Sequence, residues 1–118
     1  MTRRQHIENI IIGTLIAAFD EHWPDVRSCI TPDMIEDEFN RDTFRRMKEL
    51  HAQRQQVNLV TLSGGGTRTK EECSRLAQLA DEYDFNFLKW RENNRRWMSG
   101  QPLCNPTFEQ YVTRYITI

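Results

Sequence analysis

One short segment combines basic and aromatic side chains at high density. Residues 89–97 read Lys-Trp-Arg-Glu-Asn-Asn-Arg-Arg-Trp, with four basic residues and one acidic residue. On a helix, Arg91 and Arg95 lie one turn apart, and Glu92 can pair with Arg96. Such a segment suits a protein interface, where Trp and Arg are favoured anchors, or a nucleic-acid surface, through phosphate contacts and base stacking. It also suits a helix that buries its Trp side chains and exposes its Arg side chains.

We predict an interaction surface in this segment, made of Lys89, Trp90, Arg91, Arg95, Arg96 and Trp97. A second helical face is shared by Phe87, Trp90, Asn94 and Trp97. We expect the surface to bind a protein. The alternative is a small nucleic-acid-binding protein that uses residues 87–98 as its basic, Trp-flanked helix.

The acidic and glycine-rich segments have simpler structural explanations. Acids gather at residues 33–38, beside an expected helix start, where negative charge stabilises the helix dipole. The glycine triplet at 64–66 is followed by Thr67 and Arg68 instead of the Lys-Ser/Thr of a phosphate-binding loop. The three His residues lie in separate segments, and no Ser-His-Asp or Cys-His set can be assembled. We therefore predict no enzyme activity, no cofactor and no metal site.

Length and composition indicate a small globular protein. The 118 residues suffice for one domain of ordinary size. A formal net charge of −1 argues against unspecific nucleic-acid binding through a general basic excess. No apolar run reaches the ~18–20 residues of a membrane span, so we expect no membrane contact. Cys29, Cys73 and Cys104 are odd in number and form no C-x-x-C pair, which is typical of reduced thiols in a cytoplasmic protein.

The hydrophobic pattern predicts an all-α protein, a compact bundle of five to six helices. Apolar residues recur with helical spacing over residues 7–19, until Trp23-Pro24 is expected to break the pattern, with a short turn or helix over residues 24–30. Thr2-Arg-Arg-Gln5 and Thr69-Lys-Glu-Glu72 fit capping boxes at two of the expected helix starts. Further helices are expected at about residues 41–54 and 70–83, with residues 85–98 as another helix or a continuation, and a last helix is expected from Asn105-Pro106. Residues 57–62 are predicted to be either a buried extended piece or a tight helical start.

Four motifs follow one another in residues 7–62. Glu8 leads into Asn-Ile-Ile-Ile-Gly-Thr-Leu-Ile at 9–16, and Ile-Thr-Pro-Asp-Met at 30–34 restarts the chain. Phe39 precedes Arg-Asp-Thr-Phe-Arg-Arg-Met-Lys-Glu-Leu at 41–50, and Val-Asn-Leu-Val-Thr-Leu at 57–62 comes last. In order and spacing, these motifs resemble the N-terminal domain of DnaB-type replicative helicases. The resemblance implies a non-catalytic all-α globule with a helical hairpin, which dimerises into the helicase collar and binds primase and loader proteins.

The resemblance also suggests how the chain is organised. We expect a single helical domain over residues 1–118, with a helicase-like part at 1–62, a Gly-rich loop at 63–69 and a divergent helical part at 70–118. The chain has no phosphate-binding loop for an ATPase. We therefore expect a stand-alone interaction module of DNA replication, from a phage or mobile element. It would form a homodimer or bind a replication protein such as a helicase, primase or loader.

Overall fold

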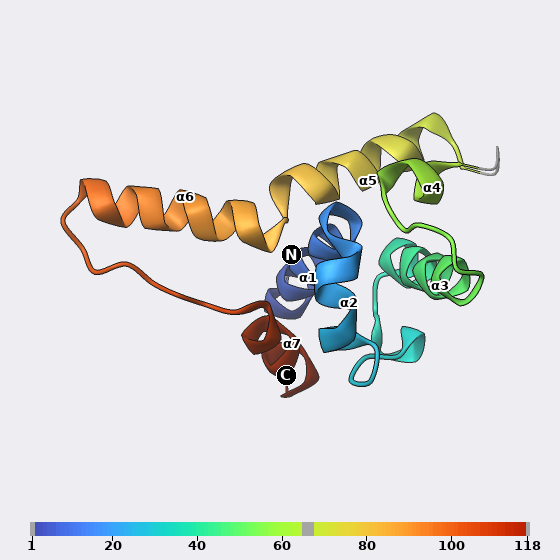
Figure 1. Ribbon diagram of the computed structural model, residues 1–118, viewed down its shortest axis with the longest axis horizontal. Helices are drawn as coiled ribbons and strands as arrows, with labels where there is room; N and C mark the ends of the chain where they lie inside the picture. The colour runs from blue at the N-terminus through green and yellow to red at the C-terminus, as the bar shows by residue number, and fades with distance from the viewer. Residues whose placement is uncertain (1, 65–67, 118) are drawn as a thin grey trace.

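The all-α prediction is confirmed. The computed structural model describes residues 2–64 and 68–117, and over these ranges the chain forms seven α-helices, one 3-10 helix and no strand. Six of the helices pack into a globule, and one projects from it, so that the molecule measures 48 × 29 × 29 Å (Figure 1). The glycine triplet is described only at Gly64, and its other two residues lie outside the described ranges.

Helix α1 (Arg3–Ala17) is the central element of the globule. The predicted capping box begins it, because Thr2 Oγ1 accepts from the Gln5 N–H at 3.1 Å and Gln5 Oε1 accepts from the Thr2 N–H at 3.2 Å. It is buried on nearly all sides from residue 10 to residue 16, since α2, α3, α5, α6 and α7 all contact it. Gly13 lets α5 approach closely, because a Cβ at this position would lie 2.9 Å from Tyr83 Cβ.

The predicted break at Trp23-Pro24 is wrong. The chain turns earlier, at Ala18, and helix α2 (Phe19–Val26) continues through Pro24. Phe19, Trp23 and Val26 are buried on one face of α2, and this burial outweighs the backbone hydrogen bond that Pro24 cannot donate. Pro24 itself is exposed.

The acidic segment at residues 33–38 has the predicted structural role. A 3-10 helix, η1 (Pro32–Met34), precedes helix α3 (Glu38–Ala52), which begins three residues before the expected start. Asp37 caps α3 by accepting from the Asn40 N–H at 2.9 Å, and it also pairs with Arg75 of α5 at 3.1 Å. Helix α4 (Leu59–Ser63) confirms the helical alternative for residues 57–62, with Asn58 as its cap.

Helix α5 (Lys70–Glu82) packs along α1, and its predicted capping box at Thr69 and Glu72 is present. The last helix, α7 (Phe108–Thr117), starts later than expected. Thr107 and Gln110 exchange hydrogen bonds at its start in the manner of a capping box. Val112 of α7 is buried against the globule, because α7 contacts both α1 and α2.

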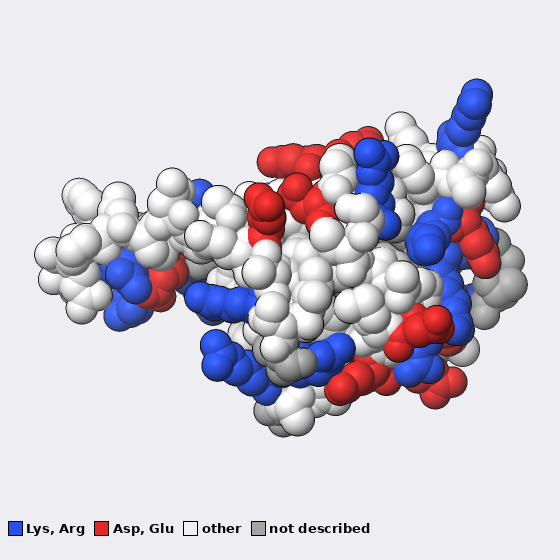
Figure 2. Space-filling view, turned by 90° about the horizontal axis from the view of Figure 1, so that it is seen from below, with Lys and Arg blue, Asp and Glu red and all other residues white. Residues whose placement is uncertain are grey.

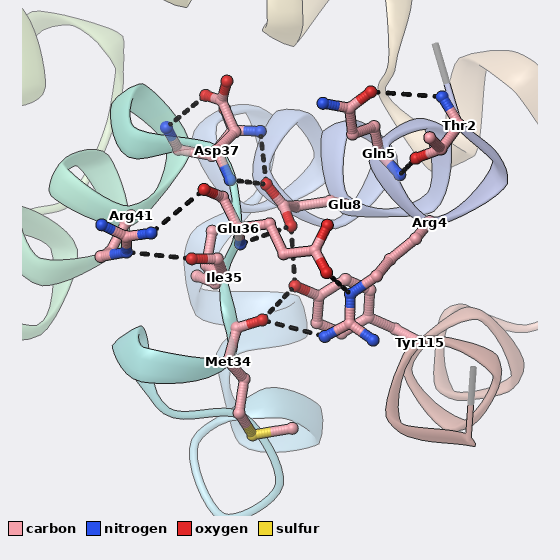
Figure 3. A network of polar contacts seen from close by, with 11 residues as sticks. Thr2, Arg4, Gln5, Glu8, Met34, Ile35, Glu36, Asp37, Arg41 and Tyr115 are labelled. Carbon is pink, nitrogen blue, oxygen red and sulfur yellow. Dashed lines mark hydrogen bonds and ion pairs between the residues drawn. The ribbon is translucent and has the colours of Figure 1, made fainter.

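A buried polar network joins the two ends of the chain (Figure 3). Glu8 of α1 is only 1% exposed. Its carboxylate accepts from the N–H groups of Glu36 and Asp37 at 3.2 and 3.1 Å, from Asn40 Nδ2 at 3.2 Å and from the Tyr115 hydroxyl at 2.7 Å. Burial, together with the bond to Glu8, raises the pKa of the Tyr115 phenol. The network therefore fastens α7 and the start of α3 to α1.

Candidate interaction surface

Helix α6 (Phe85–Met98) carries the predicted surface and is anchored only at its first turn. Asp84 caps it by accepting from the Asn86 N–H, and Phe85 is buried in the globule. The Phe85 N–H donates to Thr14 Oγ1 of α1 at 2.8 Å, which fixes the direction in which α6 leaves the globule. Beyond this turn, α6 projects along the long axis of the molecule (Figure 1). We call α6 together with the return segment, residues 99–107, the arm.

The arm exposes large apolar side chains. Trp90 is 63% exposed, Trp97 is 73% exposed and Met98 is 76% exposed. Phe87 is also exposed, and its ring stacks on Trp90 with the ring centroids 6.1 Å apart. The interpretation that buries the two Trp side chains in the core is therefore wrong. A protein rarely leaves so many large apolar groups together in water unless they form a contact site.

Two of the predicted basic residues are occupied within α6. Arg95 donates to both carboxylate oxygens of Glu92, at 2.6 and 3.2 Å, and Arg96 donates to the same carboxylate at 2.9 Å. These hydrogen bonds from Arg95 and Arg96 hold the pKa of Glu92 at about 2. The predicted Glu92–Arg96 pair is thus present, and the single negative charge of Glu92 offsets one of the two positive charges of the arginines.

The return segment is tied to α6 by Asn93, which the sequence did not point to, and by Arg96, one of the predicted residues. The Asn93 side chain donates to the Cys104 carbonyl through Nδ2 and accepts from the Cys104 N–H through Oδ1, both at 2.9 Å. Arg96 adds a bond to the Pro102 carbonyl at 3.2 Å. Gly100, whose φ of 71° suits glycine, reverses the chain after α6. The arm is therefore a helix with an extended strap along it.

The six predicted residues all lie on α6, but they do not form one uniform patch. Lys89 is half-buried near the root, 6.0 Å from the Phe85 ring, and Arg91 is exposed, 5.9 Å from the Phe87 ring. Figure 2 shows that the projecting end of the molecule is mostly uncharged, with basic and acidic atoms side by side where charge does occur. The arm is therefore primarily an apolar surface with a few cations at its edge.

The rest of the described structure offers little other chemistry. Within residues 2–64 and 68–117, no group of three or more His, Cys, Asp or Glu side chains could hold a metal ion. In the same ranges, no helix combines the length and the apolar character needed to cross a membrane. His22, the most buried of the histidines, packs against Phe108 at the root of the arm and lies 3.4 Å from Asn86 Nδ2.

Comparison with known families explains the globule. A family model described as DnaB-like helicase N-terminal domain matches residues 1–86. The chain belongs to this family. DnaB-like N-terminal domains are the non-catalytic part of replicative helicases, and no ATPase domain is detected in the chain. No curated protein and no solved structure matches the chain.

The DnaB-like match ends where the arm begins. It includes α1 to α5 and stops within the first turn of α6. The globule is thus the DnaB-like part, completed by α7 from outside the match, whereas the exposed aromatic face lies beyond it. The motifs at residues 7–62 identified the family correctly, and the match extends further along the chain than those motifs do.

Proposed function

We propose that this chain is a non-catalytic protein-interaction domain of DNA replication, and that the arm is its contact surface. It acts by self-association or by binding a replication protein, such as a helicase, primase or loader. The proposal places the chain in the cytoplasm, with the replication machinery. The observation that carries it is the exposure of Trp90 and Trp97 on a helix that is anchored at one end only.

Two further features support a protein partner. Most of the exposed large apolar side chains of the described residues lie on the arm, and hot spots of protein interfaces are enriched in Trp and Arg. The arm is also held in shape before binding, because Asn93 and Arg96 fasten the return segment to α6. A surface that is already ordered loses less conformational entropy when a partner binds.

We further propose that residues 1–118 form a single domain. The support comes from α7, which lies outside the family match but contributes Phe108, Val112 and Tyr115 to the same core as α1. The Tyr115–Glu8 bond joins residues 107 positions apart in the sequence. A domain boundary after residue 86 would separate this pair.

The experiment compares a double variant, Trp90→Ser with Trp97→Ser, with a matched control, Val60→Ser. Val60 is 77% exposed on α4, so the control also removes an exposed apolar side chain but leaves the arm intact. Sedimentation equilibrium measures self-association, and biolayer interferometry measures binding of purified replicative helicase, primase and loader. We expect the double variant to lose at least tenfold in affinity wherever the wild type binds, and the control to bind like the wild type. Unchanged self-association and partner binding in the double variant would refute the proposal.

The alternative function is nucleic-acid binding by residues 87–98. The observation in its favour is that Lys89 and Arg91 have no acidic partner among the described residues, beside exposed aromatic rings that could stack on bases. A salt titration separates the two functions. If nucleic acid is bound, the logarithm of the binding constant falls linearly with the logarithm of the salt concentration. The slope is about −1 for each phosphate that the protein neutralises. Absence of binding at low salt rejects it.

A further inference from the structure

The sequence from Lys70 to Met98 has the pattern of one uninterrupted helix. It contains no Gly and no Pro, the residues that most often end a helix. One row of positions, apolar except for a single Asn, keeps its phase at alternating spacings of four and three: Leu76, Ala80, Tyr83, Phe87, Trp90, Asn94 and Trp97. Such a row stays on one face only while the helix continues. The structure nevertheless breaks the helix at Tyr83 and Asp84, between α5 and α6.

The break costs backbone hydrogen bonds, which side chains replace. In a continuous helix the Phe85 N–H would donate to the carbonyl of Asp81, four residues earlier. In the structure it donates to Thr14 Oγ1 of α1, at 2.8 Å. The Asn86 N–H donates to the carboxylate of Asp84, whose backbone is extended with a ψ of 121°. Thr14 thus supplies, from another helix, the acceptor that lets the chain leave the helical path.

The Thr14 hydroxyl can hold the Phe85 N–H because its own hydrogen is used elsewhere. Thr14 is fully buried, and its Oγ1 donates to the carbonyl of Ile10 at 2.6 Å. The lone pairs of the oxygen are then available to accept from Phe85. A buried N–H without a partner is costly. Loss of the hydroxyl would therefore penalise the broken helix but not a continuous one, in which Asp81 accepts from this N–H.

The break also places Phe85 in the globule. Phe85 is 5% exposed, and its ring lies among those of His22, Phe108 and Tyr111, with centroids 6.3, 6.2 and 5.6 Å away. In a continuous helix Phe85 would lie about 200° around the axis from Tyr83, which packs against the core at the end of α5. Phe85 would then leave this site, so the path of α6 depends on where the backbone of Phe85 is held.

We propose that Thr14 is the positioning residue of the arm. By accepting from the Phe85 N–H, it interrupts a helix that would otherwise continue through residues 70–98, and it thereby determines the direction in which α6 presents Trp90 and Trp97. The molecule has a second, less stable arrangement, in which residues 70–98 form one helix and Phe85 leaves its site. The consequence for partner binding rests on the proposed function, whereas the two arrangements do not.

Two substitutions at Thr14 of the full chain isolate the role of the hydroxyl. Thr14→Val keeps the shape of the side chain and removes the acceptor, whereas Thr14→Ser keeps the hydroxyl. Backbone chemical shifts in NMR report the conformation of residues 83–86. We expect Thr14→Val to move the Asp84 shifts from extended toward helical values, and Thr14→Ser to retain the wild-type shifts. Wild-type shifts at Asp84 in Thr14→Val, or equal changes in both variants, would overturn the proposal.

The direction of the arm is measured as a distance between two spin labels. One label is attached to Cys29, which is exposed on the globule, and the other to the arm tip through Met98→Cys, with Cys73 and Cys104 replaced by Ser. α6 is ~20 Å long, so a change of about 20° at its root moves the tip by ~7 Å. We expect Thr14→Val to shift the distance by about this amount and Thr14→Ser to leave it unchanged. An unchanged distance in Thr14→Val contradicts the proposal.

A second pair of variants leaves the core untouched. Asp84→Ala removes the cap of α6 and favours the continuous helix, whereas Asp84→Asn keeps a capping side chain. We expect the first to shift the NMR signals of residues 83–86 as Thr14→Val does, and the second to resemble the wild type. If Thr14→Val does not fold, this pair decides the question, and an extended residue 84 in Asp84→Ala rejects the proposal.

Binding experiments separate this inference from the proposed function. Wherever the wild type binds a purified helicase, primase or loader, Thr14→Val should lose about threefold or more in affinity, although no residue of the arm is changed, because fewer molecules hold the arm in the binding direction. Thr14→Ser should bind like the wild type. Wild-type affinity in a Thr14→Val protein whose arm has moved would overturn the positioning role. The proposed function would still stand in that case, and falls only if the Trp90/Trp97 double variant binds like the wild type.

Discussion

Replacement of Glu8 by Gln tests the network that joins the two ends of the chain. The change keeps the size of the side chain but turns one carboxylate oxygen into an NH2 group. Four donors converge on this carboxylate, from Glu36, Asp37, Asn40 and Tyr115. The remaining amide oxygen can accept from the two donors on its side of the group. The new NH2 group faces the other two donors, from which it cannot accept a hydrogen bond.

The magnitude follows from the number of bonds lost. Hydrogen bonds to a charged group contribute about 1.5–3 kcal/mol each, and Glu8→Gln removes at least two of them from a site that water does not reach. We expect the free energy of unfolding to fall by about 3–6 kcal/mol, a large part of the ~5–15 kcal/mol of a typical domain. Tyr115→Phe removes one donor and should cost about 1.5–3 kcal/mol.

Urea denaturation followed by circular dichroism at pH 7 measures these losses. Glu109→Gln provides the matched control, because Glu109 is exposed on α7, and it should change stability by less than about 0.5 kcal/mol. A loss below about 1 kcal/mol for Glu8→Gln, or a larger loss for Tyr115→Phe than for Glu8→Gln, would refute the reasoning.

Three other changes test separate features of the structure. Gly13→Ala should lower the free energy of unfolding by about 1–3 kcal/mol, as measured by urea denaturation, because the methyl group collides with Leu79 of α5. This loss outweighs the better helix propensity of Ala. A variant with unchanged or higher stability would contradict the close α1–α5 crossing. Asn93→Ala should raise the rate at which the Cys104 thiol reacts with a disulfide reagent by about tenfold, because the two hydrogen bonds that hold the return segment are lost. An unchanged rate would show that the return segment does not depend on these bonds. The NMR signal of the Glu92 carboxyl group should titrate with a midpoint near pH 2. Its ion pairs with Arg95 and Arg96 are then complete above pH 4.5 and are lost as the pH falls toward 2. A midpoint near pH 4.5 would mean that these ion pairs do not persist in solution.

The sequence predicted the globule well because its signals are local. The capping boxes at Thr2 and Thr69 and the apolar spacing along α1 and α5 depend on residues three to eight positions apart. The prediction placed a break at Pro24 because proline disfavours a helical residue before it. It did not include the burial of α2 against the core, which keeps the helix intact through Pro24. That burial depends on helices distant in sequence, which a local pattern does not contain.

The arm could be predicted in part. The helix predicted over residues 85–98 is confirmed by α6. Whether its Trp side chains lie in the core or in water depends on where the helix points, to which the burial of Phe85 and the Phe85–Thr14 bond contribute. Asn93 could not be recognised, because its partner, Cys104, bonds through backbone atoms that any residue has. Glu8 offered a clearer signal, as an acid on the apolar face with Ile12 and Leu15.

The indole signals of the full chain in NMR test the role of the arm most directly. The three Trp residues are Trp23, which is buried in the globule, and Trp90 and Trp97, which are exposed on α6. As the protein concentration is raised, or as a replication protein is added, we predict that the Trp90 and Trp97 signals shift or broaden while Trp23 stays unchanged. Trp90 and Trp97 signals that remain constant under every condition, or a change confined to Trp23, would contradict the account.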